Sequence, residues 1–182
     1  MHVKGVAFLA REALVTAERG PEAWKAFLET LKRAQPFYEQ PIFPVTRIPV
    51  EVFLPALELI TSRFYDGDPE TYWKFGVSAA KNAMQNGQLK GLFGKGDDRK
   101  FLAFAPNIYK SYFDGGALTM HTPTPQQVDL KISGTPHHPY FEGSVIGFAR
   151  GGLEVLEAKD PIPTRVKGFG IGDDEIVYRF NV

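Results

Sequence analysis

Two adjacent histidines and a nearby glutamate, His137, His138 and Glu142, have the side chains that commonly hold a divalent metal. His138 and Glu142 are four residues apart, so on a helix they would share one face. A third protein ligand would have to come from elsewhere, and His121 is the one candidate. The alternative, which we favour, is that these residues cap the start of a helix and give it a polar surface.

Two glycine-rich stretches resemble nucleotide-binding loops but lack residues that those loops need. In GLFGKG, residues 91–96, Leu89 stands where a phosphate loop has its first glycine, and Gly96 stands where it has Ser or Thr. In GFGIGD, residues 168–173, Asp173 replaces the third glycine of the dinucleotide fingerprint, and a hairpin is expected there. The sequence therefore predicts no nucleotide site.

Composition excludes several classes of function. The chain has 182 residues, which favours a single domain over 1–182, and its 21 basic residues balance its 21 acidic ones. A balanced charge gives no field to attract nucleic acid. There is no cysteine, which excludes disulfides and thiolate chemistry and fits a cytoplasmic protein. No apolar run is long enough for a membrane span. The catalytic patterns G-x-S-x-G and H-E-x-x-H are absent, so we expect a non-enzymatic protein.

The first part of the chain is predicted to be helical. Apolar residues recur at spacings of three and four, and Asp68-Pro69-Glu70 is a typical helix start. Gly87 is expected to end that helix in a left-handed conformation, and Pro106 is expected to bend or split the next. A short extended piece is expected near residues 45–48. The predicted helices are 3–19, 21–34, 50–64, 68–86 and 99–113.

From Gly115 onward the apolar pattern alternates, which indicates strands. One long helix, residues 139–159, separates two hairpins. The expected fold class is therefore α+β, with an N-terminal helical half followed by strand–strand–helix–strand–strand, and an antiparallel sheet packed on the long helix. The predicted strands are 117–122, 128–133, 165–171 and 175–181.

The long helix has an unusual number of glycines, at positions 143, 147, 151 and 152. Each mid-helix glycine costs about 0.5–1 kcal/mol relative to alanine, so we expect another backbone, that of the sheet, to approach closely. The face expected to be buried carries Phe141, Val145, Phe148, Gly152 and Val155.

The order of elements resembles a fold shared by 4-vinyl reductase domains, haem NO-binding domains and subunits of the TRAPP vesicle-tethering complex. VKGVAF at the start and FYDGDPETYWKFG also resemble an uncharacterised family of similar length that is multiplied in Myxococcus-type bacteria. The stretches that carry the fold resemblance are YFDGGALTMH (112–121), VDLKIS (128–133), PYFEGSVIGFARGGLEVLEAKD (139–160) and EIVYRFNV (175–182).

The resemblance implies cofactor sites that this sequence lacks. Haem NO-binding domains carry a proximal histidine on a helix before the sheet and a Y-x-S-x-R motif for the propionates. Helix 99–113 has no histidine, and Lys131, Ser133 and Thr135 stand at the motif positions. The zinc site of many 4-vinyl reductase domains uses cysteine, which is absent. We therefore expect no haem, no metal and no other cofactor.

Three hypotheses follow. The first is a cytoplasmic, non-enzymatic ligand-binding or sensory module whose ligand is apolar, or has its polar end near His137 and His138. The second is a TRAPP-like interaction module that forms a homodimer or joins a complex through the helical half, without ligand. The third is a metal-assisted hydrolase or isomerase that uses His137, His138 and Glu142. The pocket expected under the first is lined by Trp73, Phe101, Phe104, Phe141, Val145 and Phe148.

Overall fold

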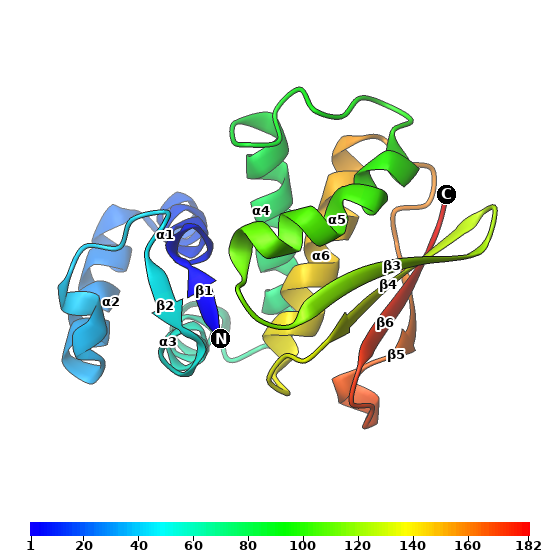
Figure 1. Cartoon of the computed structure of the whole chain (residues 1–182). Coiled ribbons are helices and arrows are strands. Elements are labelled where there is room, and N and C mark those ends of the chain that lie inside the picture. Colours follow the sequence, from blue (N-terminus) through cyan, green and yellow to red (C-terminus); the bar gives the residue numbers. More distant parts are fainter. The chain divides into compact units, whose positions relative to one another are not determined.

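The computed structural model describes all residues from 1 to 182, and the chain divides into two compact units (Figure 1). The N-terminal unit comprises Met1–Asp68 and Tyr112–Asp114, and the C-terminal unit comprises Pro69–Ser111 and Gly115–Val182. None of the helices in either unit is both long and apolar enough to cross a membrane.

The N-terminal unit is mainly helical, as predicted. Gly20, at φ +87°, separates the first two helices, and Pro21 opens the second of them, where its missing N–H costs no hydrogen bond. The buried apolar residues of this unit include Phe8, Trp24 and Leu31. Its helices are α1 (Gly5–Arg19), α2 (Pro21–Ala34), the short η1 (Pro36–Glu39) and α3 (Val50–Tyr65).

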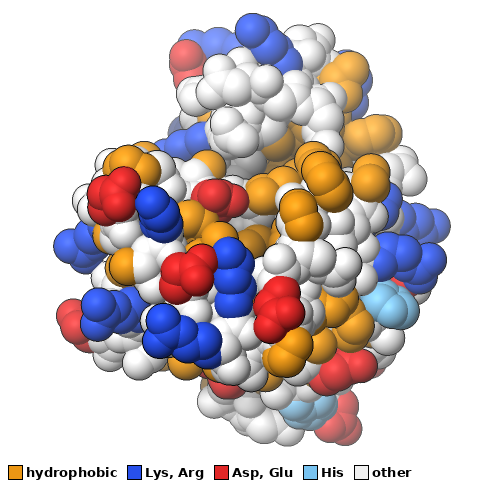
Figure 2. All heavy atoms as spheres, turned by 90° about the vertical axis from the view of Figure 1, so that its left-hand side faces the viewer, with side chains coloured by type: hydrophobic (Ala, Val, Ile, Leu, Met, Phe, Trp, Pro, Cys, Tyr) orange, Lys and Arg blue, Asp and Glu red, His pale blue; other side chains and the backbone are white.

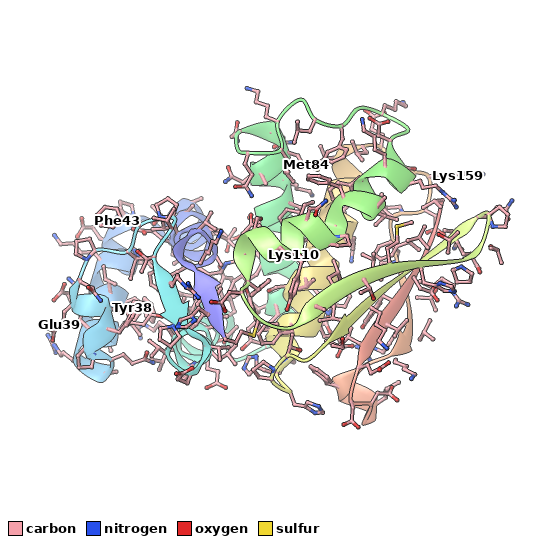
Figure 3. The ribbon with its side chains drawn as sticks, viewed as in Figure 1. Tyr38, Glu39, Phe43, Met84, Lys110 and Lys159 are labelled. Carbon is pink, nitrogen blue, oxygen red and sulfur yellow. The ribbon has the colours of Figure 1, made fainter.

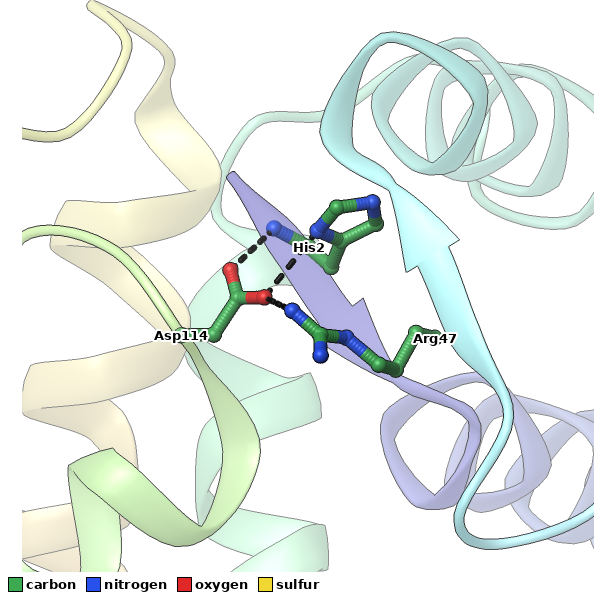
Figure 4. Close-up of polar contacts among 3 residues, drawn as sticks. All are labelled: His2, Arg47 and Asp114. Carbon is green, nitrogen blue, oxygen red and sulfur yellow. Dashed lines mark hydrogen bonds and ion pairs between the residues drawn. The ribbon is translucent and has the colours of Figure 1, made fainter.

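A two-stranded sheet in this unit joins β1 (His2–Lys4) to β2 (Arg47–Pro49). The sequence indicated an extended piece near β2 but not β1. The His2 backbone N–H donates to Asp114 Oδ1 at 2.5 Å, and Arg47 Nη2 donates to Oδ2 of the same carboxylate (Figure 4). These contacts, the His2 N–H foremost, lower the pKa of Asp114 to about 2.

The connector between η1 and β2 exposes large apolar side chains. Phe43 is 60% exposed and Val45 is 78% exposed. Hydrophobic side chains gather on the face that Figure 2 shows, and Figure 3 marks Phe43 within the connector. We call residues 41–45 the apolar connector.

The C-terminal unit is a sheet with three helices, and it contains the predicted strand–strand–helix–strand–strand order (Figure 1). All neighbouring strands are antiparallel, in the order β3-β4-β6-β5. The elements are α4 (Thr71–Gln85), α5 (Asp98–Tyr112), β3 (Ala117–Thr124), β4 (Gln127–Ser133), α6 (Pro139–Val155), β5 (Thr164–Lys167), the short η2 (Phe169–Ile171) and β6 (Ile176–Asn181).

The central strands β4 and β6 bury the side chains that their alternating pattern predicted. Leu130 of β4 pairs with Tyr178 of β6, and both are almost fully buried. The edge strand β5 is exposed along its whole length and carries Arg165 and Lys167. Charged side chains on an edge strand discourage pairing with other chains.

Three glycines of α6, Gly143, Gly147 and Gly151, approach another backbone, but that backbone belongs to helix α4 and not to the sheet. The fourth, Gly152, faces the Phe101 ring of α5. A Cβ added to Gly147 would lie 2.8 Å from the Trp73 carbonyl oxygen, and one added to Gly76 of α4 would lie 2.3 Å from the Ser144 carbonyl oxygen. The Ser144 hydroxyl also donates to the Tyr72 carbonyl at 3.0 Å. The expectation of a sheet was wrong because α4 carries a glycine of its own, which lets two helices pack this closely.

The predicted buried face of α6 needs correction as well. Phe141 and Gly152 are buried, whereas Val145, Phe148 and Val155 are only half-buried. The glycine face of α6 packs against α4. Val145, Phe148 and Val155 therefore point away from the deepest part of the contact between the two helices. The helix ends at Val155 rather than Lys159.

Two local predictions along α4 were also wrong. Helix α4 begins at Thr71, and Asp68-Pro69-Glu70 precedes it as a turn. It ends at Gln85, and Gly87 is not left-handed. Helix α5 is not split at Pro106, since it continues through the proline to Tyr112.

Candidate functional site

A pocket of about 460 Å³ opens in the C-terminal unit where α6 begins. Three segments build it: the start of α4, the residues entering α6, and the connection from β5 into η2. Its lining combines aromatic rings with charged groups: Pro69, Glu70, Trp73, His137, His138, Pro139, Glu142, Gly143, Arg165, Phe169 and Gly170.

Glu142 is a buried carboxylate at this pocket, with only 5% of the residue exposed. Its Oε1 accepts a hydrogen bond from the Tyr178 hydroxyl at 2.6 Å and lies 2.8 Å from Arg165 Nε. Its Oε2 accepts from the Phe169 backbone N–H at 3.2 Å. A buried charge of this kind is tolerated only when it is paired and hydrogen-bonded, and both oxygens meet that condition.

Gly168 makes room for this carboxylate. A Cβ added to Gly168 would lie 2.5 Å from Glu142 Oε1. The φ of Gly168 is −171°, which any residue can adopt, so the need for glycine is one of space. The first glycine of GFGIGD is thus explained by packing against Glu142 and not by a nucleotide.

Arg165 lies against the hydroxyl end and the ring of Tyr178. Its Nε donates to the Tyr178 hydroxyl at 2.7 Å, and its guanidinium carbon is 5.7 Å from the ring centroid. This hydrogen bond raises the pKa of Arg165, while burial raises the pKa of Tyr178. The side chain of Arg165 is 42% exposed, and its two terminal nitrogens make no hydrogen bond within the chain.

The two histidines have separate roles. His138 caps α6, because its Nδ1 accepts from the Tyr140 backbone N–H at 3.1 Å. His137 stacks on Phe169, with ring centroids 4.3 Å apart and planes inclined by 18°. Since Glu142 is held by Arg165 and Tyr178 instead, the three residues considered for a metal do not converge, and the chain has no group of three such side chains placed to hold one.

The six residues expected to line a ligand pocket lie in different surroundings. Trp73 lines the pocket described here and contacts the Tyr178 ring edge to face at 5.5 Å. Phe101 is fully buried beside Phe93, and Phe104 is 36% exposed. Phe141 is fully buried in the core, and Val145 and Phe148 are half-buried on α6. None of these other five lines the pocket.

Sequence reasoning missed Arg165, Phe169 and Tyr178 as site residues. The alternation in β6 did place Tyr178 on the buried face, which was a usable signal. Gly168 was a second signal, although nothing in the sequence showed that Glu142 is what approaches it. The pairing of β5 with β6, which the second predicted hairpin anticipated, sets Arg165 opposite Tyr178. The contact of α6 with β6, which brings Glu142 to both, is not revealed by sequence spacing.

No protein-family model and no curated protein sequence matches this chain. Solved structures do match. The fold is that of H-NOX domains. An H-NOX protein from S. oneidensis in the Fe(II)NO state aligns with a TM-score of 0.70 and 14% identity, covering 98% of this chain and 99% of that one.

Two further H-NOX structures agree with this assignment of the fold. The Fe(II) unliganded H-NOX protein from K. algicida aligns with a TM-score of 0.68 and 14% identity, covering 98% of this chain and 95% of that one. A variant of Tt H-NOX gives a TM-score of 0.72 at 12% identity, with 98% and 94% coverage. Identities this low establish the fold and leave the function to the residues.

The residues present do not fit haem. A haem iron in a protein is held by His, Cys, Met or Tyr, and α5 carries none of the first three. Its buried Tyr109 donates its hydroxyl to the Gly115 carbonyl at 2.9 Å. Lys131, at the first motif position, pairs with Glu175 at 2.8 Å, and Thr135, at the third, carries no charge to bind a propionate.

Proposed function

We propose that this chain is a non-enzymatic small-molecule-binding module with a sensory role, and that its ligand occupies the pocket at the start of α6. The observation that carries the proposal is the pocket of about 460 Å³, because small-molecule sites typically measure about 300–1,000 Å³. Function in the cytoplasm, as one domain and without haem, is part of the proposal.

The lining supports binding more than catalysis. Ligand sites commonly combine aromatic walls with a few convergent polar groups, and Trp73, Phe169 and Arg165 supply both. Glu142 is the buried carboxylate that could act as a general base, but its oxygens already accept hydrogen bonds. The pocket proposed here is thus mixed in character, whereas the sequence favoured an apolar one.

A second candidate function is an interaction module that acts through the helical half. The observation that favours it is the apolar connector, where Phe43 and Val45 are 60% and 78% exposed. Contiguous exposed apolar surface often marks a protein-binding site. A homodimer or a heteromeric complex would be the expected product.

One pair of variants separates the two functions. A thermal-shift screen of aromatic acids, fatty acids and terpenoids should yield compounds that raise the melting temperature of the parent protein and of Phe43→Ala, but not of Trp73→Ala. At a hundredfold excess over Kd, binding stabilises the fold by about 2.7 kcal/mol. Native mass spectrometry of the same proteins reports bound compound and oligomer together.

The outcomes point in opposite directions. Loss of the shift in Trp73→Ala alone supports ligand binding at this pocket. If no compound shifts the parent, and Phe43→Ala converts a dimer into a monomer, the interaction function replaces the proposed one.

A further inference from the structure

We propose that the ligand of this pocket is a planar aromatic carboxylate, with its carboxylate on the terminal nitrogens of Arg165 and its ring between Trp73 and the His137–Phe169 stack. The inference rests on the proposed function, because it names the class of ligand for the same pocket.

Arg165 is held in place by its Nε and keeps hydrogen-bond donors that no group of the chain uses. Its Nε is anchored by the Tyr178 hydroxyl at 2.7 Å and by Glu142 Oε1 at 2.8 Å. Its two terminal nitrogens remain available, and a planar guanidinium fork matches a carboxylate in two parallel hydrogen bonds. A fork fixed before the ligand arrives loses little conformational freedom on binding.

The charged groups around the pocket favour a ligand with a single negative charge. Glu142 is compensated within the chain, so it offers no free carboxylate to a cationic ligand. Glu70 also lines the pocket, and Asp174 lies 3.7 Å from His137. These carboxylates would repel a dianion such as phosphate more strongly than a single carboxylate, so a monoanion fits best.

Aromatic side chains of the pocket lining favour a ligand with a planar ring. The stack of His137 on Phe169 forms a flat wall, and the half-buried Trp73 is a second aromatic surface on the lining. Aromatic rings pair favourably at centroid distances of about 4.5–7 Å in offset or edge arrangements. A planar ring is therefore the ligand shape that can pack against both aromatic surfaces.

The test compares two probes that differ in charge and share their shape, indole-3-acetate and indole-3-acetamide. Both are titrated into the ¹⁵N-labelled full chain and followed by NMR. The acid should bind at least about tenfold more tightly than the amide, since a charge-assisted bidentate pair is about twice as strong as a neutral one. Shifts should centre on the Trp73 indole and the residues around Gly168.

The variants must not leave Glu142 as an unpaired buried charge. We therefore use the double variant Arg165→Gln/Glu142→Gln, with Glu142→Gln alone as the matched control, and check folding by circular dichroism. The preference for the acid should disappear in the double variant and persist in the control. Arg165→Lys, which keeps the charge but loses the fork, should keep only part of the preference.

Three results would overturn the inference. Equal binding of the acid and the amide would show that the protein does not recognise the negative charge of the carboxylate. The proposed function would still stand. A preference for the acid that survives in the double variant would assign recognition to another cation. If neither probe binds at millimolar concentration, aromatic carboxylates are not the ligand class, and the broader screen described above decides the proposed function separately.

Discussion

The Tyr178 hydroxyl donates a hydrogen bond of 2.6 Å to Glu142 Oε1, and this bond joins the central strand β6 to the first turn of α6. Both residues are almost fully buried. Glu142 lines the pocket, and Arg165 Nε contacts both the Tyr178 hydroxyl and Glu142 Oε1, so the three groups form one hydrogen-bonded cluster.

Removal of the Tyr178 hydroxyl should be costly, and the chain provides a matched control. Tyr178→Phe should lower the free energy of unfolding by about 1–3 kcal/mol, because Glu142 loses a buried donor. The hydroxyl of Tyr38 is buried without a hydrogen-bond partner in the chain, so Tyr38→Phe should be neutral or slightly stabilising. Urea denaturation of the two variants measures the difference. Equal losses would mean that the bond to Glu142 contributes nothing specific.

The close contact of α4 with α6 should tolerate no added methyl group. We expect Gly76→Ala and Gly147→Ala each to cost about 1–3 kcal/mol through overpacking, since the new Cβ would meet backbone atoms at 2.3 and 2.8 Å. Gly94→Ala is the control, because its Cβ would have its nearest neighbour at 3.9 Å. Chemical denaturation should place the control within error of the parent. Parent-like melting of both α4–α6 variants would refute the close packing.

The Asp114 carboxylate should stabilise the fold in a pH-dependent way. Its pKa falls from 3.8 to about 2 on folding, chiefly through the His2 backbone N–H. A lowered carboxyl pKa contributes stability that is fully present above about pH 4 and is lost as the pH falls towards about 2. The difference in melting temperature between the parent and Asp114→Asn should therefore shrink over that interval. A difference that stays constant down to pH 2 would contradict this role.

Three phenylalanines should rank by their burial. Phe101 is fully buried and its ring covers Gly152, so Phe101→Ala should cost about 3–5 kcal/mol. Phe148 is half-buried, and Phe148→Ala should cost about 1–2 kcal/mol. Phe104 is 36% exposed, and its replacement by alanine should cost less than about 1 kcal/mol. If urea denaturation shows a larger loss of stability for Phe148→Ala than for Phe101→Ala, the buried face of α6 predicted from the sequence would be correct.

The parts of the fold that depend on local pattern could be predicted. The spacing of Trp24, Phe27 and Leu31 predicted a helix, and Gly20-Pro21 marked its start, so the predicted range 21–34 matches α2. The alternation in β4 and β6 gave the buried face of the sheet, including Tyr178. In these elements one face is more buried than the other, so the spacing of apolar residues in the sequence indicates which side chains pack inward.

The parts that depend on pairing between distant segments could not be predicted. The glycines of α6 signalled a close approach, but only the position of Gly76 opposite them shows that the partner is α4. The pocket likewise needs Arg165 beside Glu142. Strand pairing sets Arg165 opposite Tyr178, but Glu142 reaches both only because α6 packs against β6. Of the six residues expected to line a pocket, five lie outside the pocket at the start of α6. The sequence pattern of an aromatic residue is the same whether the side chain fills a core or lines a cavity.

The contact between Gly168 and Glu142 has a consequence for how this protein can vary over evolution. An alanine at position 168 would place its Cβ 2.5 Å from Glu142 Oε1, whereas an aspartate at position 142 would withdraw the carboxylate by one methylene. The two positions should therefore change together: among descendants of this sequence, a side chain at 168 is expected only where 142 is shorter. A lineage that kept glutamate at position 142 would have to keep glycine at position 168, even if the neighbouring loop residues varied freely.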